Sequence, residues 1–154
     1  MIGAIAGDVI GSVYEHHNVK RDDFPLFDPR CTFTDDSVLT VALAEAIASG
    51  KGYADLLREY WRRYPHRGYG GRFGAWARTA GRGPYGSFGN GAAMRISPAG
   101  WAYGSLEETL EKAREFTAVT HDHPEGIKGG QATAAAIFLA RTGSTKDEIR
   151  DYVE

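Results

Sequence analysis

The chain has 154 residues, of which 42% are hydrophobic and 12% aromatic, so it can bury a core as one domain and is not intrinsically disordered. Its formal net charge of -2 argues against nucleic acid or an anionic membrane surface as the main partner. Cys31 is the only cysteine, which excludes an intrachain disulfide and a thiolate metal cluster. Without a signal-peptide pattern or an apolar run of membrane-spanning length, we expect a soluble cytoplasmic protein.

Residues 2 to 12 place Gly3, Gly7 and Gly11 four apart, which on a helix gives one stripe without side chains. Each glycine costs a helix interior about 1 kcal/mol relative to alanine, so three in register predict close packing against another helix or a ligand. Residues 13 to 33 then lose helical periodicity and collect prolines and aspartates. We expect a long surface loop there, of the kind that often serves as a functional lid.

Two adjacent acids, Asp35 and Asp36, stand between Thr34 and Ser37, directly before an apolar helical pattern that ends at Gly50. One interpretation is helix capping, because carboxylates at a helix start accept free N–H groups and complement the helix dipole. The other is a metal site, because this stretch crowds hard oxygen donors that suit Mg²⁺ or Mn²⁺. These residues alone leave both interpretations open.

Residues 54 to 64 and 73 to 80 are expected to form two further helices, stopped by Pro65 and Gly81. Seven arginines between residues 58 and 82 are opposed only by Glu59, and they are Arg58, Arg62, Arg63, Arg67, Arg72, Arg78 and Arg82. Their functional interpretation is phosphate binding, with stacking of arginines and aromatic residues on a nucleotide base. The alternative is a solvated helical face.

Residues 81 to 91 are too rich in glycine for regular structure and lead into a short expected helix at residues 92 to 96, which Pro98 would end or kink. A glycine loop before a helix can cradle an anion, because its backbone N–H groups are open and the helix dipole favours negative charge. The loop matches neither a Walker A sequence nor a dinucleotide fingerprint. A flexible connector is the alternative.

Ser105 begins a capping box and therefore a helix, and another helix is expected from Pro124 to about Gly143. His121 lies between these helices, where it can be either a hydrogen-bonded structural residue or part of a site. Thr145 begins a second capping box, which predicts a last helix from about residue 146. No segment alternates as a strand does, so we expect an all-α fold.

Four motifs resemble the N-terminal part of the ADP-ribosylglycohydrolase family. They are GAIAGDVIGSVYE at residues 3 to 15, FTDDS at 33 to 37, GSFGNGAAMR at 86 to 95 and THDHP at 120 to 124. The resemblance covers essentially the whole chain as one partial domain, 1–154. It implies an orthogonal helical bundle around a binuclear metal site that cleaves the glycosidic bond of ADP-ribosylated protein or of a small ADP-ribose derivative.

The resemblance also implies roles for individual residues. Thr34, Asp35 and Asp36 would bind Mg²⁺ or Mn²⁺, and Glu15 would close over the metals from its loop. The implied catalytic residues are Glu15, Asp35 and Asp36. The implied substrate-binding residues, which would contact the diphosphate and riboses, are Ser87, Phe88, Gly89, Asn90, Gly91 and His121.

The family completes its metal site with a second acidic motif, Asp-x-Asp-Thr, which these 154 residues do not contain. The resemblance therefore implies that the C-terminal portion of the bundle is lacking here and that activity needs it, supplied by a second polypeptide or a second copy. Two other uses of the fold remain open. They are a non-catalytic module that binds ADP-ribose or a nucleotide, and a structural role.

Overall fold

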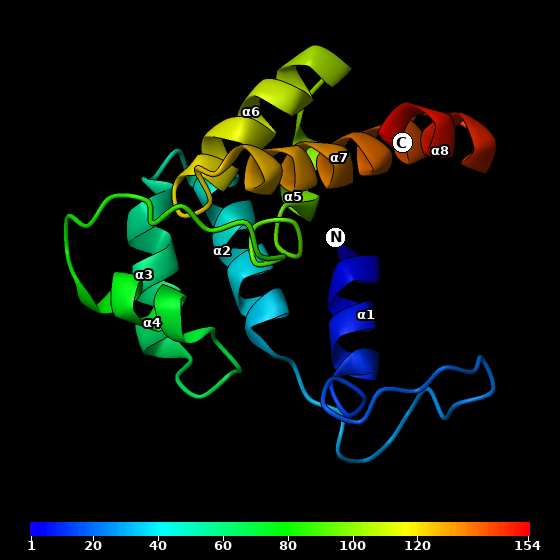
Figure 1. Cartoon of the computed structure of the whole chain (residues 1–154), viewed down its shortest axis with the longest axis horizontal. Helices are drawn as coiled ribbons and strands as arrows, with labels where there is room; N and C mark the ends of the chain where they lie inside the picture. Colours follow the sequence, from blue (N-terminus) through cyan, green and yellow to red (C-terminus); the bar gives the residue numbers. More distant parts are fainter.

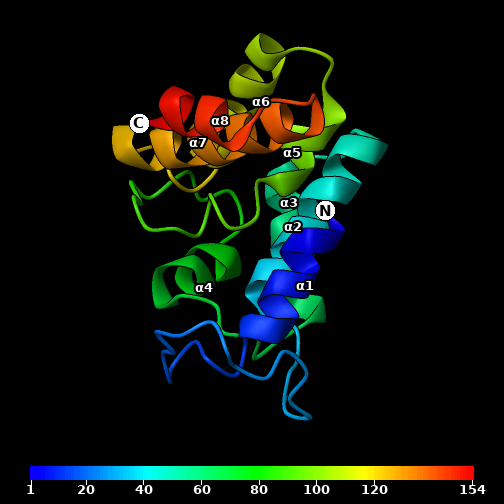
Figure 2. The ribbon, with the colours of Figure 1, turned by 90° about the vertical axis from the view of Figure 1, so that its right-hand side faces the viewer.

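The computed structural model describes all 154 residues and contains eight helices and no strand, so the expected all-α fold is confirmed. The helices are α1 (Ile2–Gly11), α2 (Asp35–Ser49), α3 (Tyr53–Arg63), α4 (Gly71–Arg78), α5 (Ser97–Ala102), α6 (Leu106–Ala118), α7 (Pro124–Arg141) and α8 (Lys146–Val153). In Figures 1 and 2, α1 and α2 run alongside each other while α7 and α8 lie crosswise over one end of them. The helices therefore form an orthogonal bundle.

The helix ends follow from local sequence chemistry. Thr34 caps α2, because its hydroxyl accepts a hydrogen bond from the Asp36 N–H at 3.3 Å, and Gly50 ends this helix in the left-handed region at φ 70°. Thr145 forms the complete capping box expected at the start of α8. At α7, Pro124 occupies the first turn and the His123 side chain accepts the Glu125 N–H at 3.2 Å.

The prediction of a short helix at residues 92 to 96 is wrong. Residues 91 to 95 form turns, and α5 begins only at Ser97, with Pro98 in its first turn. Proline fits the first turn of a helix because the N–H that it lacks has no intrahelical acceptor there. Pro98 therefore starts a helix where it was expected to stop one.

The glycine stripe of α1 does not pack as expected. A Cβ atom built at Gly3, Gly7 or Gly11 would meet nothing within 4 Å, and no residue of α1 is buried. The stripe faces open space because α1 contacts α2 through other residues, among them Asp8. Residues 12 to 34 form the long surface loop that the sequence predicts, below α1 in Figure 1.

The core gathers around α2. Its buried face carries Leu39, Leu43 and Ala46, which pack with side chains of α3 and α4 such as Leu57 and Trp76. This packing holds the rear turns of α2 inside the protein and leaves its first turn at the edge of the core. The functional consequence is a fixed position for the two acids that begin the helix.

A second layer is formed by α5, α6 and α7, which pack at close range where Gly100 faces Ile137 and Gly130 faces Thr117. The Arg141 guanidinium donates to the Gly100 carbonyl at 2.8 Å, and the Gln131 amide donates to the Leu110 carbonyl at 3.0 Å. This layer carries the start of α7 and the segment before it, which holds His121. None of the eight helices combines the length and hydrophobicity needed to cross a bilayer.

Two neighbouring glycines of α7 give a matched test of this layer. A Cβ at Gly130 would lie 3.2 Å from Thr117 Cβ and 3.3 Å from Thr117 Cγ2, whereas one at Gly129 would meet nothing within 4 Å. We expect Gly130→Ala to lower the free energy of unfolding by about 1 to 3 kcal/mol through overpacking. Gly129→Ala should raise it by up to about 1 kcal/mol through helix propensity. Urea denaturation measures both changes, and equal shifts in the two variants would contradict the packing described.

Candidate functional site

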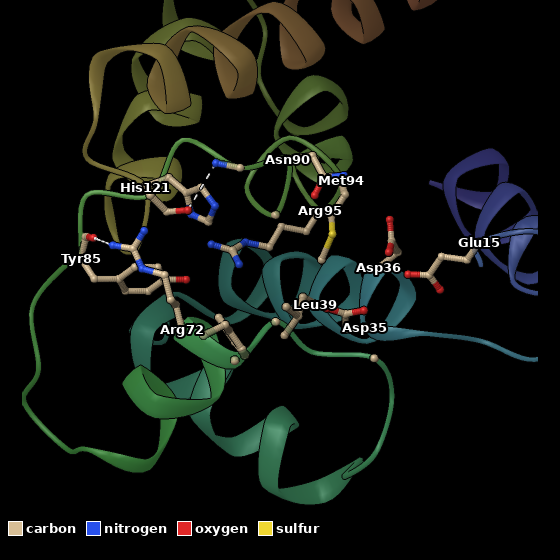
Figure 3. Close-up of a pocket in the computed structure, with 17 residues that line it drawn as sticks. Glu15, Asp35, Asp36, Leu39, Arg72, Tyr85, Asn90, Met94, Arg95 and His121 are labelled. Atoms are coloured by element: carbon tan, nitrogen blue, oxygen red, sulfur yellow. Dashed lines mark hydrogen bonds between the residues drawn. The ribbon is translucent and has the colours of Figure 1, made fainter. Parts of the chain in front are cut away.

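A cavity of about 430 Å³ lies between the start of α2, the start of α4, the glycine loop and the segment before α7. Most of the residues that the sequence predicts as site residues line it, namely Glu15, Asp35, Asp36, Ser87, Gly89, Asn90, Gly91 and His121. Figure 3 shows the acidic side chains at one end and Arg72, Tyr85 and His121 at the other, with Arg95 between them. The cavity therefore has an acidic end and a basic, aromatic end.

The acidic end is built on the first turn of α2. Partial burial raises the pKa of Asp35 to about 7, helped by the negative charges of Asp36 and Glu15. Burial also raises the pKa of Asp36, and the next contribution comes from Asp8. Neither Asp35 nor Asp36 forms a salt bridge with a basic side chain. The pair is an anionic site without a protein cation to balance it.

Asp8 organises this first turn and was not predicted as a site residue. Its carboxylate accepts the Thr34 N–H at 2.9 Å, the Thr34 hydroxyl at 2.6 Å and the Ser37 N–H at 3.1 Å. These bonds fasten α1 to the start of α2 and satisfy N–H groups that a helix leaves free. Asp8 belongs to the glycine-rich motif at residues 3 to 15, but a single acid inside a helix gives no local signal of a partner 26 residues away.

Thr34 lies beside the cavity and does not line it. Its hydroxyl donates to Asp8 and accepts the Asp36 N–H, so the residue that caps α2 is Thr34 and not one of the two aspartates to which the capping interpretation gave this role. Its role as a metal ligand stays a prediction. The oxygen donors of Asp35 and Asp36 fit a hard divalent cation by chemical type, yet nowhere does the chain gather three His, Cys, Asp or Glu side chains closely enough to hold a metal ion.

The glycine loop is held against the segment before α7. Gly86, at φ 63°, donates its N–H to the Asp122 carboxylate at 2.7 Å. A Cβ at Gly126 would lie 2.6 Å from the Ser87 carbonyl oxygen, so only glycine lets the first turn of α7 approach the loop this closely. The loop is therefore anchored, and its residues Gly89 and Asn90 face the cavity. The flexible-connector interpretation does not describe it.

Phe88 is the one predicted residue of this loop that does not line the cavity. Its side chain is 66% exposed, and its ring centroid lies 5.1 Å from that of His123. The neighbours of Phe88 turn inward while Phe88 turns outward. A role for Phe88 in substrate binding stays a prediction.

Three lining residues at the basic end were not predicted as individual site residues. Arg72 donates to the Tyr85 carbonyl and lies over the Tyr85 ring at 5.2 Å, and Arg95 is only 1% exposed. Burial, followed by the charges of Arg95 and Arg72, lowers the pKa of His121 to about 4, so its imidazole is neutral at pH 7. Of the arginine-rich stretch, Arg72 alone lines this cavity. Arg58, by contrast, is buried and bonds to backbone carbonyls.

Comparison with known proteins bears on what this cavity is for. The family model described as ADP-ribosylglycohydrolase matches residues 1–154. The chain belongs to the ADP-ribosylglycohydrolase family. This membership agrees with the all-helical bundle and with the family resemblance of the four sequence motifs.

Curated relatives of this ADP-ribosylglycohydrolase chain include ADP-ribosylhydrolase ARH3 of three vertebrates. The chain is 28% identical to the Xenopus tropicalis protein over 179 residues, which cover 96% of this chain and 51% of the relative. It is also 28% identical to the Mus musculus protein over 183 residues and to the Homo sapiens protein over 186, covering 96% of this chain and 50% of each relative. The chain therefore spans about half the length of the curated relatives it matches.

The raised pKa of Asp35 predicts how the stability of this ADP-ribosylglycohydrolase chain depends on pH without metal. Between the unfolded value of 3.8 and the folded value of about 7, the folded protein binds a proton that the unfolded chain does not bind. The lowered pKa of His121 makes stability rise with pH up to about 6.5, so the test concerns the Asp35 contribution alone. That contribution to the free energy of unfolding should fall as pH rises through this window. With solvent screening allowed for, the loss from pH 5 to pH 8 is about 1 kcal/mol.

Asp35→Asn should remove this contribution, and chemical denaturation in EDTA at pH 5 and pH 8 measures the change. Asp22→Asn is the matched control, because Asp22 is an exposed acid of the long loop that forms no salt bridge. If Asp35→Asn and the unchanged chain showed the same pH dependence, the pKa of Asp35 would not be raised in the folded protein.

Proposed function

We propose that this chain forms the ADP-ribose-binding part of a metal-dependent hydrolase that cleaves the glycosidic bond of ADP-ribosylated protein or of a small ADP-ribose derivative. The observation that carries the proposal is one cavity that gathers Glu15, the two acids of α2, the glycine loop and His121 from segments far apart in the sequence. Family membership supports the same reaction class. The single cysteine suits a reducing cytoplasm as the compartment.

The polarity of the cavity suits this substrate. ADP-ribose carries its negative charge on the diphosphate, while cleavage of the glycosidic bond develops positive charge at the ribose anomeric carbon. The basic end offers Arg72, Arg95 and the open loop around Gly89 and Asn90 to the diphosphate. The acidic end then receives the scissile ribose. Binding in this orientation places each charge of the reacting substrate opposite a charge of the protein.

At the acidic end, Asp35 and Asp36, with Thr34, are the residues that would hold Mg²⁺ or Mn²⁺. When bound, such a cation polarises oxygen ligands and lowers the pKa of bound water. Glu15 lines the same end and raises the pKa of both aspartates by its charge. In the reaction Glu15 and Asp36 would stabilise the oxocarbenium-like transition state, while water adds to the anomeric carbon and the acceptor leaves with a proton.

We further propose that another polypeptide segment completes this site and the bundle, either in the same protein or from a second polypeptide or copy. Two aspartates supply only part of the ligands that Mg²⁺ needs. Apolar surface is also open beside α1, where Ile2 is 85% exposed and Trp101 53% exposed. An open groove of about 580 Å³ runs between Met1, Trp101 and Ile137. An apolar surface of this kind favours coverage by a partner.

One observation favours a second candidate function. The loop and the basic end are assembled, but no three His, Cys, Asp or Glu side chains form a metal-binding group. A non-catalytic module that binds ADP-ribose or a nucleotide needs only the assembled part. The hydrolase needs Asp35 and Asp36 for activity, whereas the binding module does not need them.

Release of ADP-ribose from ADP-ribosylated protein in Mg²⁺ tests the proposed function. The 154-residue chain is assayed alone and with the second half of a relative supplied as a separate polypeptide. We expect release with the added half, reduced about 100-fold or more by Asp35→Ala with Asp36→Ala and unchanged by Asp22→Ala. If neither sample released ADP-ribose, the hydrolase would be contradicted and the non-catalytic binding module would be the remaining function. Release that tolerates the double change would contradict the role of the acidic pair.

A further inference from the structure

A buried chain of hydrogen bonds connects Arg95 to His121 through Thr120. The Arg95 guanidinium donates from Nη2 to Thr120 Oγ1 at 2.6 Å, and Thr120 Oγ1 lies 2.7 Å from His121 Nδ1. Arg95, Thr120 and His121 are 1%, 0% and 3% exposed, so water does not compete for these bonds. Thr120 is the link between the other two.

Donor and acceptor chemistry fixes the direction of the first bond and favours one direction for the second. A guanidinium has donors only, so Thr120 Oγ1 must accept from Arg95. The Thr120 hydroxyl has a single proton, for which His121 Nδ1 at 2.7 Å is one acceptor and the Tyr85 hydroxyl is the other candidate. If the hydroxyl donates to Nδ1 across their short and fully buried contact, Nδ1 carries no proton. In a neutral imidazole the proton then sits on Nε2.

The Nε2 atom of His121 lies at the glycine loop. A Cβ built at Gly91 would be 3.3 Å from Nε2 and 3.4 Å from Cε1, and both His121 and Gly91 line the cavity. With its proton on Nε2, His121 is a donor at the end of the cavity that it shares with Arg72, next to Arg95 (Figure 3). A wall of donors selects a ligand atom that only accepts, such as an anionic oxygen.

Arg95 has a second feature that points to an anion. No carboxylate forms a salt bridge with it, and its guanidinium lies 5.8 Å from the rings of Tyr53 and Phe73. A buried charge without a counter-charge is costly in the free protein. A ligand anion in the cavity would balance it.

We propose that Arg95 and Thr120 are positioning residues that lock His121 in its neutral Nε2–H tautomer, so that this N–H is a fixed donor to an anionic oxygen of the ligand. The identity of the ligand, the diphosphate of ADP-ribose, rests on the proposed function. The lock itself rests on the hydrogen bonds alone. The lowered pKa of His121 agrees with it, because an imidazole beside two arginines stays neutral.

The tautomer is measured by a long-range ¹H–¹⁵N spectrum of the histidine rings in the ligand-free 154-residue chain, with His121→Gln to assign the signal. We expect Nδ1 at the shift of an unprotonated nitrogen and Nε2 at that of a protonated one. The opposite pattern, or averaged shifts, would overturn the lock. This measurement needs no folded variant of Arg95 or Thr120.

Variants then test the positioning roles. Thr120→Val removes the donor to Nδ1 with little change of shape, and we expect mixed tautomers and about tenfold weaker ADP-ribose binding by calorimetry. The conservative Thr120→Ser should keep the locked tautomer. Arg95→Met should unlock it, and Arg95→Lys should keep it, because only the first removes the donor that makes Thr120 an acceptor.

An unchanged tautomer in Thr120→Val, or a changed tautomer with full ADP-ribose affinity, would contradict the proposal. The ligand-free spectrum separates this failure from a failure of the proposed function. If the unchanged chain does not bind ADP-ribose, the proposed function falls while the spectrum still decides whether His121 is locked.

Discussion

The structure depends on the electrostatic constraint at the first turn of α2, where Asp35 and Asp36 are held side by side with partial burial. Burial raises both pKa values, and the charge of Asp36 adds to this for Asp35 while the charge of Asp8 adds to it for Asp36, so the folded protein holds two carboxylates where their charged forms are disfavoured. Two devices make that possible. The apolar face of α2 anchors its rear turns in the core, and Asp8 accepts three hydrogen bonds from Thr34 and Ser37 at its front. Two carboxylates held in this way are oxygen donors of the type that a divalent cation takes, which is the role proposed for them.

The other end of the cavity carries positive charge and hydrogen-bond donors, opposite in character to the acidic end. Arg72, Arg95 and the open loop near Gly89 supply positive charge and N–H groups, and His121 adds a neutral imidazole. The two ends are built on different parts of the bundle, because α2 carries the acids while the start of α7 presses the loop into place through Gly126. Packing of α7 against α6 therefore helps to position the glycine loop, although the interiors of these two helices do not line the cavity.

Local sequence chemistry predicted much of the fold, because capping residues such as Ser105 and Thr145 and the stop at Gly50 act within one turn of the chain. It failed where a residue has two uses, as at Pro98, which can begin a helix as well as end one. At the site, the motifs pointed to the acids and the glycine loop. They could not show Asp8 or Arg95, since the partners of these residues lie 26 and 25 positions away. Their roles depend on tertiary contacts that no local pattern encodes.

The central claim is that this cavity binds ADP-ribose across its two ends with a divalent cation at the acidic one. Calorimetric titration of the chain with ADP-ribose, in Mg²⁺ and in EDTA, tests it most directly when repeated on the Asp35→Ala, Asp36→Ala double variant. The account predicts binding that strengthens in Mg²⁺ and loses this metal dependence in the double variant. Absence of binding, or equal affinity in all four titrations, would contradict it.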